Sequence, residues 1–160
     1  MSDRETFSIE LEKPLRGSSG RGRLDVWFRI IADDGWEWRC AIELKFFRKI
    51  NHREPNNRYD VFKDILRLEN CGDEADLAFM LVATDHPHYI SQNSYSPDTS
   101  DFDFRHGQSY RSGTLLTYRT GGYGPPIALY ADYYFAWAEA TNSLRYMLLE
   151  IQPVAKPDHR

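Results

Sequence analysis

Residues 40–47 read Cys-Ala-Ile-Glu-Leu-Lys-Phe-Phe, an apolar strand pattern that contains one acid and one amine. Because the side chains of a strand alternate between the two faces of a sheet, Glu43 and Lys45 must share one face. The apolar residues of the other face are Cys40, Ile42, Leu44 and Phe46. We expect this apolar set to form core, leaving a carboxylate and an ammonium together on the polar face.

The segment 23–30 alternates in the same way. Its expected core face carries Leu24, Val26, Phe28 and Ile30, and its polar face carries Arg23, Asp25, Trp27 and Arg29. The intervening Asp33-Asp34-Gly35 is a hairpin signal, because glycine readily takes the left-handed conformation of a three-residue loop. If Ala32 pairs with Trp36 across this loop, counting back places Asp25 opposite Glu43. Two carboxylates and one ammonium then converge.

Two further elements are predicted downstream. Residues 57–69 have helical periodicity, with an expected core face of Tyr59, Phe62, Ile65 and Leu66 and an expected solvated face of Asp60, Lys63, Asp64 and Arg67. Residues 76–84 form a continuous apolar run of strand length, which is typical of a strand covered on both faces.

This arrangement resembles the PD-(D/E)XK nuclease superfamily, whose motif places an acid on one strand and acid-x-Lys on the next. The matching residues are Asp25 and Glu43-Leu44-Lys45, and the strand, strand, helix, strand order continues the resemblance over roughly residues 6–85, about half the chain. The resemblance implies an α+β restriction-endonuclease-like core. Such a core has a mixed central β-sheet flanked by helices, and extra strands are expected towards the C-terminus.

The resemblance implies a Mg²⁺-dependent DNA endonuclease, a hydrolase of phosphodiester bonds, in which Mn²⁺ substitutes for Mg²⁺ and which belongs to a restriction or other defence system. Asp25, Glu43 and Lys45 are the expected catalytic residues. Two carboxylates suit a hard divalent cation, which activates water and neutralises the scissile phosphate. Lys45 would act as a base or as an electrostatic clamp, and both roles stay open. Glu10, on an expected strand over residues 6–12, is interpreted as a surface carboxylate in preference to a third metal ligand, and both interpretations stay open.

Basic residues near this site are candidate contacts to nucleic acid: Arg16, Arg21, Arg23, Arg48, Lys49, Arg53 and Lys63. The formal net charge is -4, but residues 1–58 carry a net +2 and residues 59–160 a net -6. Cations therefore concentrate beside the expected site, although a solvated connector and a solvated helix face explain several of them equally well.

We expect one domain over residues 1–160, with its core at about 6–85, a C-terminal elaboration at about 86–152 and a tail at 153–160. Within the elaboration, 86–125 are expected as loops with short hairpins. Strands are expected over 127–137 and 144–151, and their aromatic residues form core or a surface for a homodimer or partner subunit.

The two cysteines, Cys40 and Cys71, are expected to be reduced and intracellular. Asp85-His86-Pro87-His88 is interpreted as a loop rather than a zinc site, because proline interrupts it and no compact Cys/His set accompanies it. No apolar run approaches membrane-spanning length, so we expect a cytoplasmic protein with no membrane partner.

Two alternatives to an active nuclease remain at this point. One is a catalytically silent nuclease-like fold that serves as a DNA-binding or protein-assembly module. The other is an unrelated α+β interaction protein in which Glu43 and Lys45 are a solvated surface pair.

Overall fold

A computed structural model of the chain describes residues 6–15 and 22–155. The strands are β1 (Thr6–Pro14), β2 (Arg23–Ile31), β3 (Glu37–Phe47), β4 (Leu77–Thr84), β5 (Ser109–Tyr110), β6 (Tyr133–Tyr134), β7 (Ala138–Glu139) and β8 (Arg145–Ile151). The helices are α1 (Glu54–Glu69), α2 (His88–Ser91) and two short 3-10 helices, η1 (Lys49–Asn51) and η2 (Pro97–Thr99).

The protein is of the α+β class, with one mixed sheet of six strands in the order β1-β2-β3-β4-β8-β7 and a separate β5-β6 pair. The described residues group into two compact units. The first contains the chain up to Leu44, Leu68–Met80 and the residues from Glu150, and the second contains Lys45–Arg67 and Leu81–Leu149. In the part of the chain described, no helix combines the length and the apolar character needed to cross a membrane.

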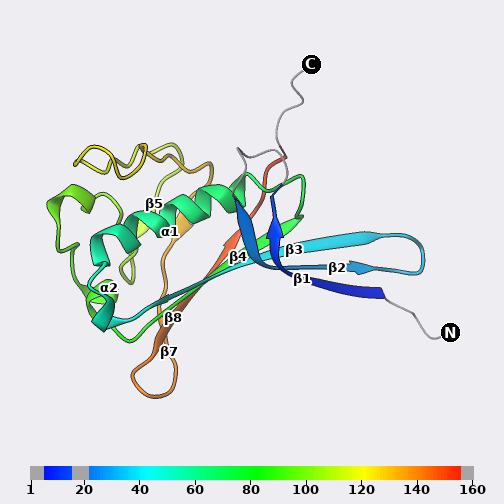
Figure 1. Cartoon of the computed structure of the whole chain (residues 1–160), viewed down its shortest axis with the longest axis horizontal. Coiled ribbons are helices and arrows are strands. Elements are labelled where there is room, and N and C mark those ends of the chain that lie inside the picture. The colour runs from blue at the N-terminus through cyan, green and yellow to red at the C-terminus, as the bar shows by residue number, and fades with distance from the viewer. Residues whose placement is uncertain (1–5, 16–21, 156–160) are drawn as a thin grey trace. The chain divides into compact units, whose positions relative to one another are not determined.

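The β2–β3 hairpin has the register that its turn predicts (Figure 1). Ala32 donates its N–H to the carbonyl of Trp36 at 2.8 Å, and Gly35 adopts a φ of 83°, which suits glycine. Val26 pairs with Ile42 at the far end of the paired region. The predicted hairpin is therefore confirmed.

The predicted core face of β3 is confirmed at Cys40, which is buried, but is wrong for the residues that follow it. Leu44 and Phe46 are exposed and Ile42 is half-buried, whereas Ala41, Glu43 and Phe47 on the other face are buried. The same holds for Trp27 of β2, which was expected on the polar face and is buried. Alternation decides which residues share a face, but the elements that pack on the sheet decide which face is covered.

Helix α1 begins at Glu54, three residues before the predicted start. Pro55 fits there because proline is tolerated in the first turn, where its missing N–H would have no helical partner. Asp64, expected on the solvated face, is buried, so that part of the prediction is wrong. Its position between Val61, Ile65 and Leu68 belongs to the apolar stripe of the helix.

Strand β4 is confirmed at Leu77–Thr84, but it is not covered equally on both faces. Ala78, Met80, Val82 and Thr84 are buried, and the alternating positions are half-buried. Towards the C-terminus, β8 is confirmed at Arg145–Ile151. Residues 127–137 show the predicted alternation of burial, although only Tyr133–Tyr134 is paired as a strand there.

Aromatic side chains form the core of the second unit. Phe62 of α1 lies with its ring centroid 5.7 Å from those of Phe102 and Phe135, and 6.1 Å from that of Tyr110. Phe135 and Trp137 are buried, so the core interpretation of these C-terminal aromatics is confirmed. The cysteines Cys40 and Cys71 are free and buried.

Candidate functional site

Asp25 and Glu43 lie at the same step of the β2–β3 register. Val26 pairs with Ile42, so one further step places Asp25 opposite Glu43, as the turn predicts. At this step the carboxylate of each residue accepts a hydrogen bond from a main-chain N–H of the opposite strand. Asp25 donates its N–H to Glu43 Oε2 at 3.2 Å, and Leu44 donates its N–H to Asp25 Oδ2 at 2.8 Å. The two carboxylates are therefore fixed against adjoining strands by reciprocal hydrogen bonds.

The regular ladder on the other side of β2 is also interrupted at this point. The pairs Leu11–Val26 and Lys13–Leu24 flank the step, while Glu12, which would face Asp25, has a left-handed φ of 51°. Irregular strand geometry of this kind is common beside functional sites, because it redirects side chains. Glu43 is only 2% exposed, so it is not part of a solvated surface pair, and the prediction of such a pair is wrong.

Lys45 follows Glu43 by two residues on β3 and is held by a carboxylate from α1. Its Nζ lies 2.5 Å from Oδ2 of Asp64, whose side chain is 2% exposed. Asp64 also lies 3.0 Å from Arg67 on the same helix. Burial raises the pKa of Asp64, and the charge of Lys45 opposes that rise. Asp64 thus positions the ammonium group of the acid-x-Lys motif.

This raised pKa leads to a testable pH dependence. A carboxyl whose pKa is higher in the folded state holds its proton more tightly when folded, so its contribution to stability is full below its ordinary value of 3.8 and is lost as the pH rises through the folded pKa. Asp64→Asn removes this titration. The stability of the wild type relative to Asp64→Asn should therefore fall as the pH rises.

Urea unfolding of both proteins between about pH 4 and pH 8 measures this difference. Asp132→Asn, which removes one exposed carboxylate, controls for the loss of a charge. A stability of the wild type that rises with pH relative to that of Asp64→Asn would contradict the assignment.

Asp25 and Glu43 are the two carboxylates that could hold a metal ion at this step. Within residues 6–15 and 22–155, no group of three or more His, Cys, Asp or Glu side chains is arranged to hold a metal. Mg²⁺ is usually held by one or two carboxylates and keeps water and substrate phosphate oxygens as its remaining ligands. Asp25 and Glu43 supply that number of carboxylates. Glu10 is exposed and accepts a hydrogen bond from Lys13 at 3.0 Å.

The candidate contacts to nucleic acid are distributed unevenly. Arg16 and Arg21 lie outside the described residues. Arg23 is exposed and lies 3.4 Å from Glu12, and exposed Lys63 lies 3.2 Å from Asp60. The remaining three, Arg48, Lys49 and Arg53, line one pocket in the second unit.

Sequence reasoning missed Asp64 and the rings of that pocket. Asp64 carried a usable signal, because positions 61, 64, 65 and 68 follow helical spacing and three of them are apolar. A carboxylate inside an apolar stripe is expected to be buried and paired. The pocket rings carried no comparable signal, since they come from α2 and from separate loops.

Comparison with known proteins adds no assignment: no protein-family model, no curated protein and no solved structure matches this chain.

Proposed function

We propose that this protein is a Mg²⁺-dependent endonuclease that hydrolyses phosphodiester bonds of DNA, with a PD-(D/E)XK-like site formed by Asp25, Glu43 and Lys45. The observation that carries the proposal is that Asp25 and Glu43, at one step of the β2–β3 register, each accept a hydrogen bond from a main-chain N–H of the opposite strand. Each carboxylate is oriented by a main-chain N–H, and the motif lysine follows on the same strand.

The chemistry follows from these groups. When bound, Mg²⁺ would supply charge neutralisation at the phosphate and a water that is nucleophilic near neutral pH. Asp25 and Glu43 would hold the ion. Lys45 would stabilise the additional negative charge of the transition state or take a proton from the attacking water. Asp64 supports the lysine, because its buried carboxylate contacts and orients the side-chain nitrogen of Lys45.

Isosteric variants test this proposal. Asp25→Asn and Glu43→Gln keep a side-chain oxygen that accepts the N–H of the neighbouring strand, but each removes the charge that binds metal. Both are expected to lower Mg²⁺-dependent nicking of supercoiled plasmid by about 100-fold or more and to weaken Mg²⁺ binding in calorimetry. Melting temperatures should change little.

Asp34→Asn is the matched control, because Asp34 also accepts a main-chain N–H, from Trp36 at 2.9 Å, in the same hairpin. It should nick plasmid at the wild-type rate. Nicking that persists in both site variants, or that is unchanged by a chelator, would contradict the proposal. Wild-type protein that binds DNA without any cleavage would favour the silent DNA-binding alternative. Cleavage assays run in parallel with RNA and with DNA of the same length show which nucleic acid is the substrate.

A further inference from the structure

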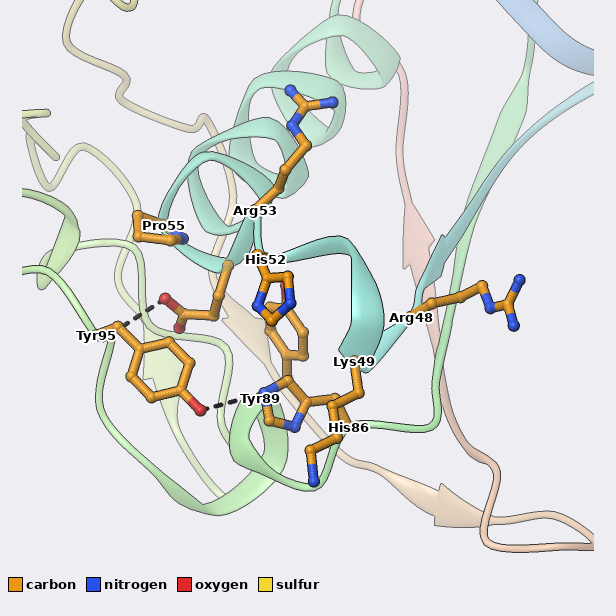
Figure 2. Close-up of a pocket in the computed structure, with 9 residues that line it drawn as sticks. Arg48, Lys49, His52, Arg53, Pro55, His86, Tyr89 and Tyr95 are labelled. Carbon is orange, nitrogen blue, oxygen red and sulfur yellow. Dashed lines mark hydrogen bonds between the residues drawn. The ribbon is translucent and has the colours of Figure 1, made fainter.

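A basic pocket of about 310 Å³ opens in the second unit where β3 leads through η1 into α1 (Figure 2). Its rim carries the cations of the Arg48–Arg53 segment, and its interior is lined by rings. The pocket is lined by Arg48, Lys49, His52, Arg53, Glu54, Pro55, His86, Tyr89 and Tyr95. This volume lies at the lower end of ligand pockets, which measure about 300–1,000 Å³, and suits one nucleotide better than a duplex.

The pocket favours an anion. Arg48, Lys49 and Arg53 are exposed, and the first turn of the 16-residue helix α1 begins at the same rim. Glu54, the carboxylate of the lining, is buried and paired with buried Arg58. Its negative charge is therefore already compensated inside the protein, and the charge presented to a ligand is positive.

The pocket also offers an aromatic platform. Tyr95 is 62% exposed, and one face of its ring stacks on His88 with centroids 3.7 Å apart and planes 8° apart. Its hydroxyl lies 3.2 Å from Nε2 of His86, and its main-chain N–H is held by Glu54 at 3.1 Å. The ring is thus oriented before any ligand arrives. Exposed rings of this kind stack on the bases of single-stranded nucleic acid.

His52 is a second unusual feature of this rim. It has a left-handed φ of 47°, a conformation that favours glycine and is uncommon for other residues. Its side chain is exposed and lines the pocket rather than packing in the core. Figure 2 shows Arg48 and Arg53 extending away from the rings on separate sides.

We infer that this pocket binds one unstacked nucleotide of the DNA, with its phosphates held by Arg48, Lys49 and Arg53 and its base stacked on Tyr95. The inference rests on the proposed function, because the ligand belongs to the same DNA that is cleaved. Arg48 follows Lys45 by three residues, a span of at most about 10 Å. A DNA strand rises about 3.4 Å per nucleotide, so the pocket lies within about three nucleotides of the phosphate at Lys45.

A phosphotyrosine peptide is the competing ligand, since it also joins a phosphate to a ring. Two observations favour the nucleotide. The guanidinium groups of Arg48 and Arg53 diverge from the rings, which suits successive phosphates along a strand better than one terminal phosphate. The rim also continues from the strand that carries Lys45.

The test measures binding of a fluorescent single-stranded oligothymidylate to the full chain in the presence of a chelator, so that neither metal nor cleavage is needed. Tyr95→Ala is expected to weaken binding by about 10-fold. Tyr134→Ala is the matched control, because Tyr134 is also exposed, at 60%, but lies on β6. Arg48→Gln should reduce the slope of log affinity against log salt by about 0.7.

The variant His52→Gly separates an effect on stability from an effect on oligonucleotide binding. Glycine suits the left-handed backbone, so the melting temperature should be unchanged or higher while oligonucleotide affinity falls. Wild-type affinity for the oligonucleotide in both Tyr95→Ala and His52→Gly would overturn the inference. In a competition experiment, thymidine monophosphate should displace the oligonucleotide at a lower concentration than a phosphotyrosine peptide does. The opposite order would also overturn the inference. If the protein binds the oligonucleotide through Tyr95 but does not nick plasmid, the inference that the pocket binds a nucleotide is supported. Only the proposed nuclease activity would then fail.

Discussion

Lys45→Ala is expected to slow plasmid nicking by about 100-fold or more, because it removes a positioned charge from the site of phosphoryl transfer. It should also destabilise the protein, which a change at an ordinary surface lysine would not do. The ammonium of Lys45 lies 2.5 Å from buried Asp64, and its loss leaves that carboxylate paired with Arg67 at 3.0 Å. We expect a cost of about 1–3 kcal/mol, less than for a pair with no second cation.

The double variant Lys45→Ala/Asp64→Asn separates these two effects. Replacing the buried carboxylate with a neutral amide should restore much of the stability, while nicking stays low because the motif lysine is still missing. Arg105→Ala is the control for losing a paired cation, since Lys45 and Arg105 are both 27% exposed and Arg105 pairs with Asp103 at 2.8 Å. Nicking at the wild-type rate by Lys45→Ala would remove Lys45 from the mechanism.

Glu54→Ala is expected to cause a large loss of stability in the second unit, far larger than the loss of a surface carboxylate. The carboxylate accepts hydrogen bonds from Arg58, from Ser94 and from the main-chain N–H of Tyr95. Truncation leaves the buried guanidinium of Arg58 without this counter-charge. Breaking a buried ion pair in this way costs about 3–5 kcal/mol, which corresponds to a fall of roughly 6–20 °C in melting temperature.

Glu139→Ala provides the matched comparison. Glu139 is 76% exposed and pairs with Arg145 at 2.8 Å, so its removal should cost at most about 1 kcal/mol. Glu54→Ala should also weaken oligonucleotide binding, because Tyr95 loses the acceptor that orients its main chain. Equal melting temperatures for the two variants would show that the Glu54–Arg58 pair does not stabilise the unit.

Local sequence was sufficient for the β2–β3 hairpin, for β4 and β8, and for the register at the candidate site. The Asp33-Asp34-Gly35 turn sets the β2–β3 pairing by itself, since a short loop leaves few alternative registers, and this pairing puts Asp25 opposite Glu43. The alternation of residues 127–137 likewise predicted which of their side chains are buried, although most of them do not pair as strands.

Burial of Glu43, the pairing of Lys45 with Asp64 and the pocket around Tyr95 were decided only by the tertiary structure. Periodicity assigns residues to the same face, but it does not say which face another element will cover. Lys45 and Asp64 lie on different elements, and the pocket joins η1, the start of α1 and the loop that carries Tyr95. These contacts form only when segments distant in the sequence pack together. The free energy gained by burying a face of a strand or helix depends on which element covers that face, and the alternation of apolar and polar residues does not determine this.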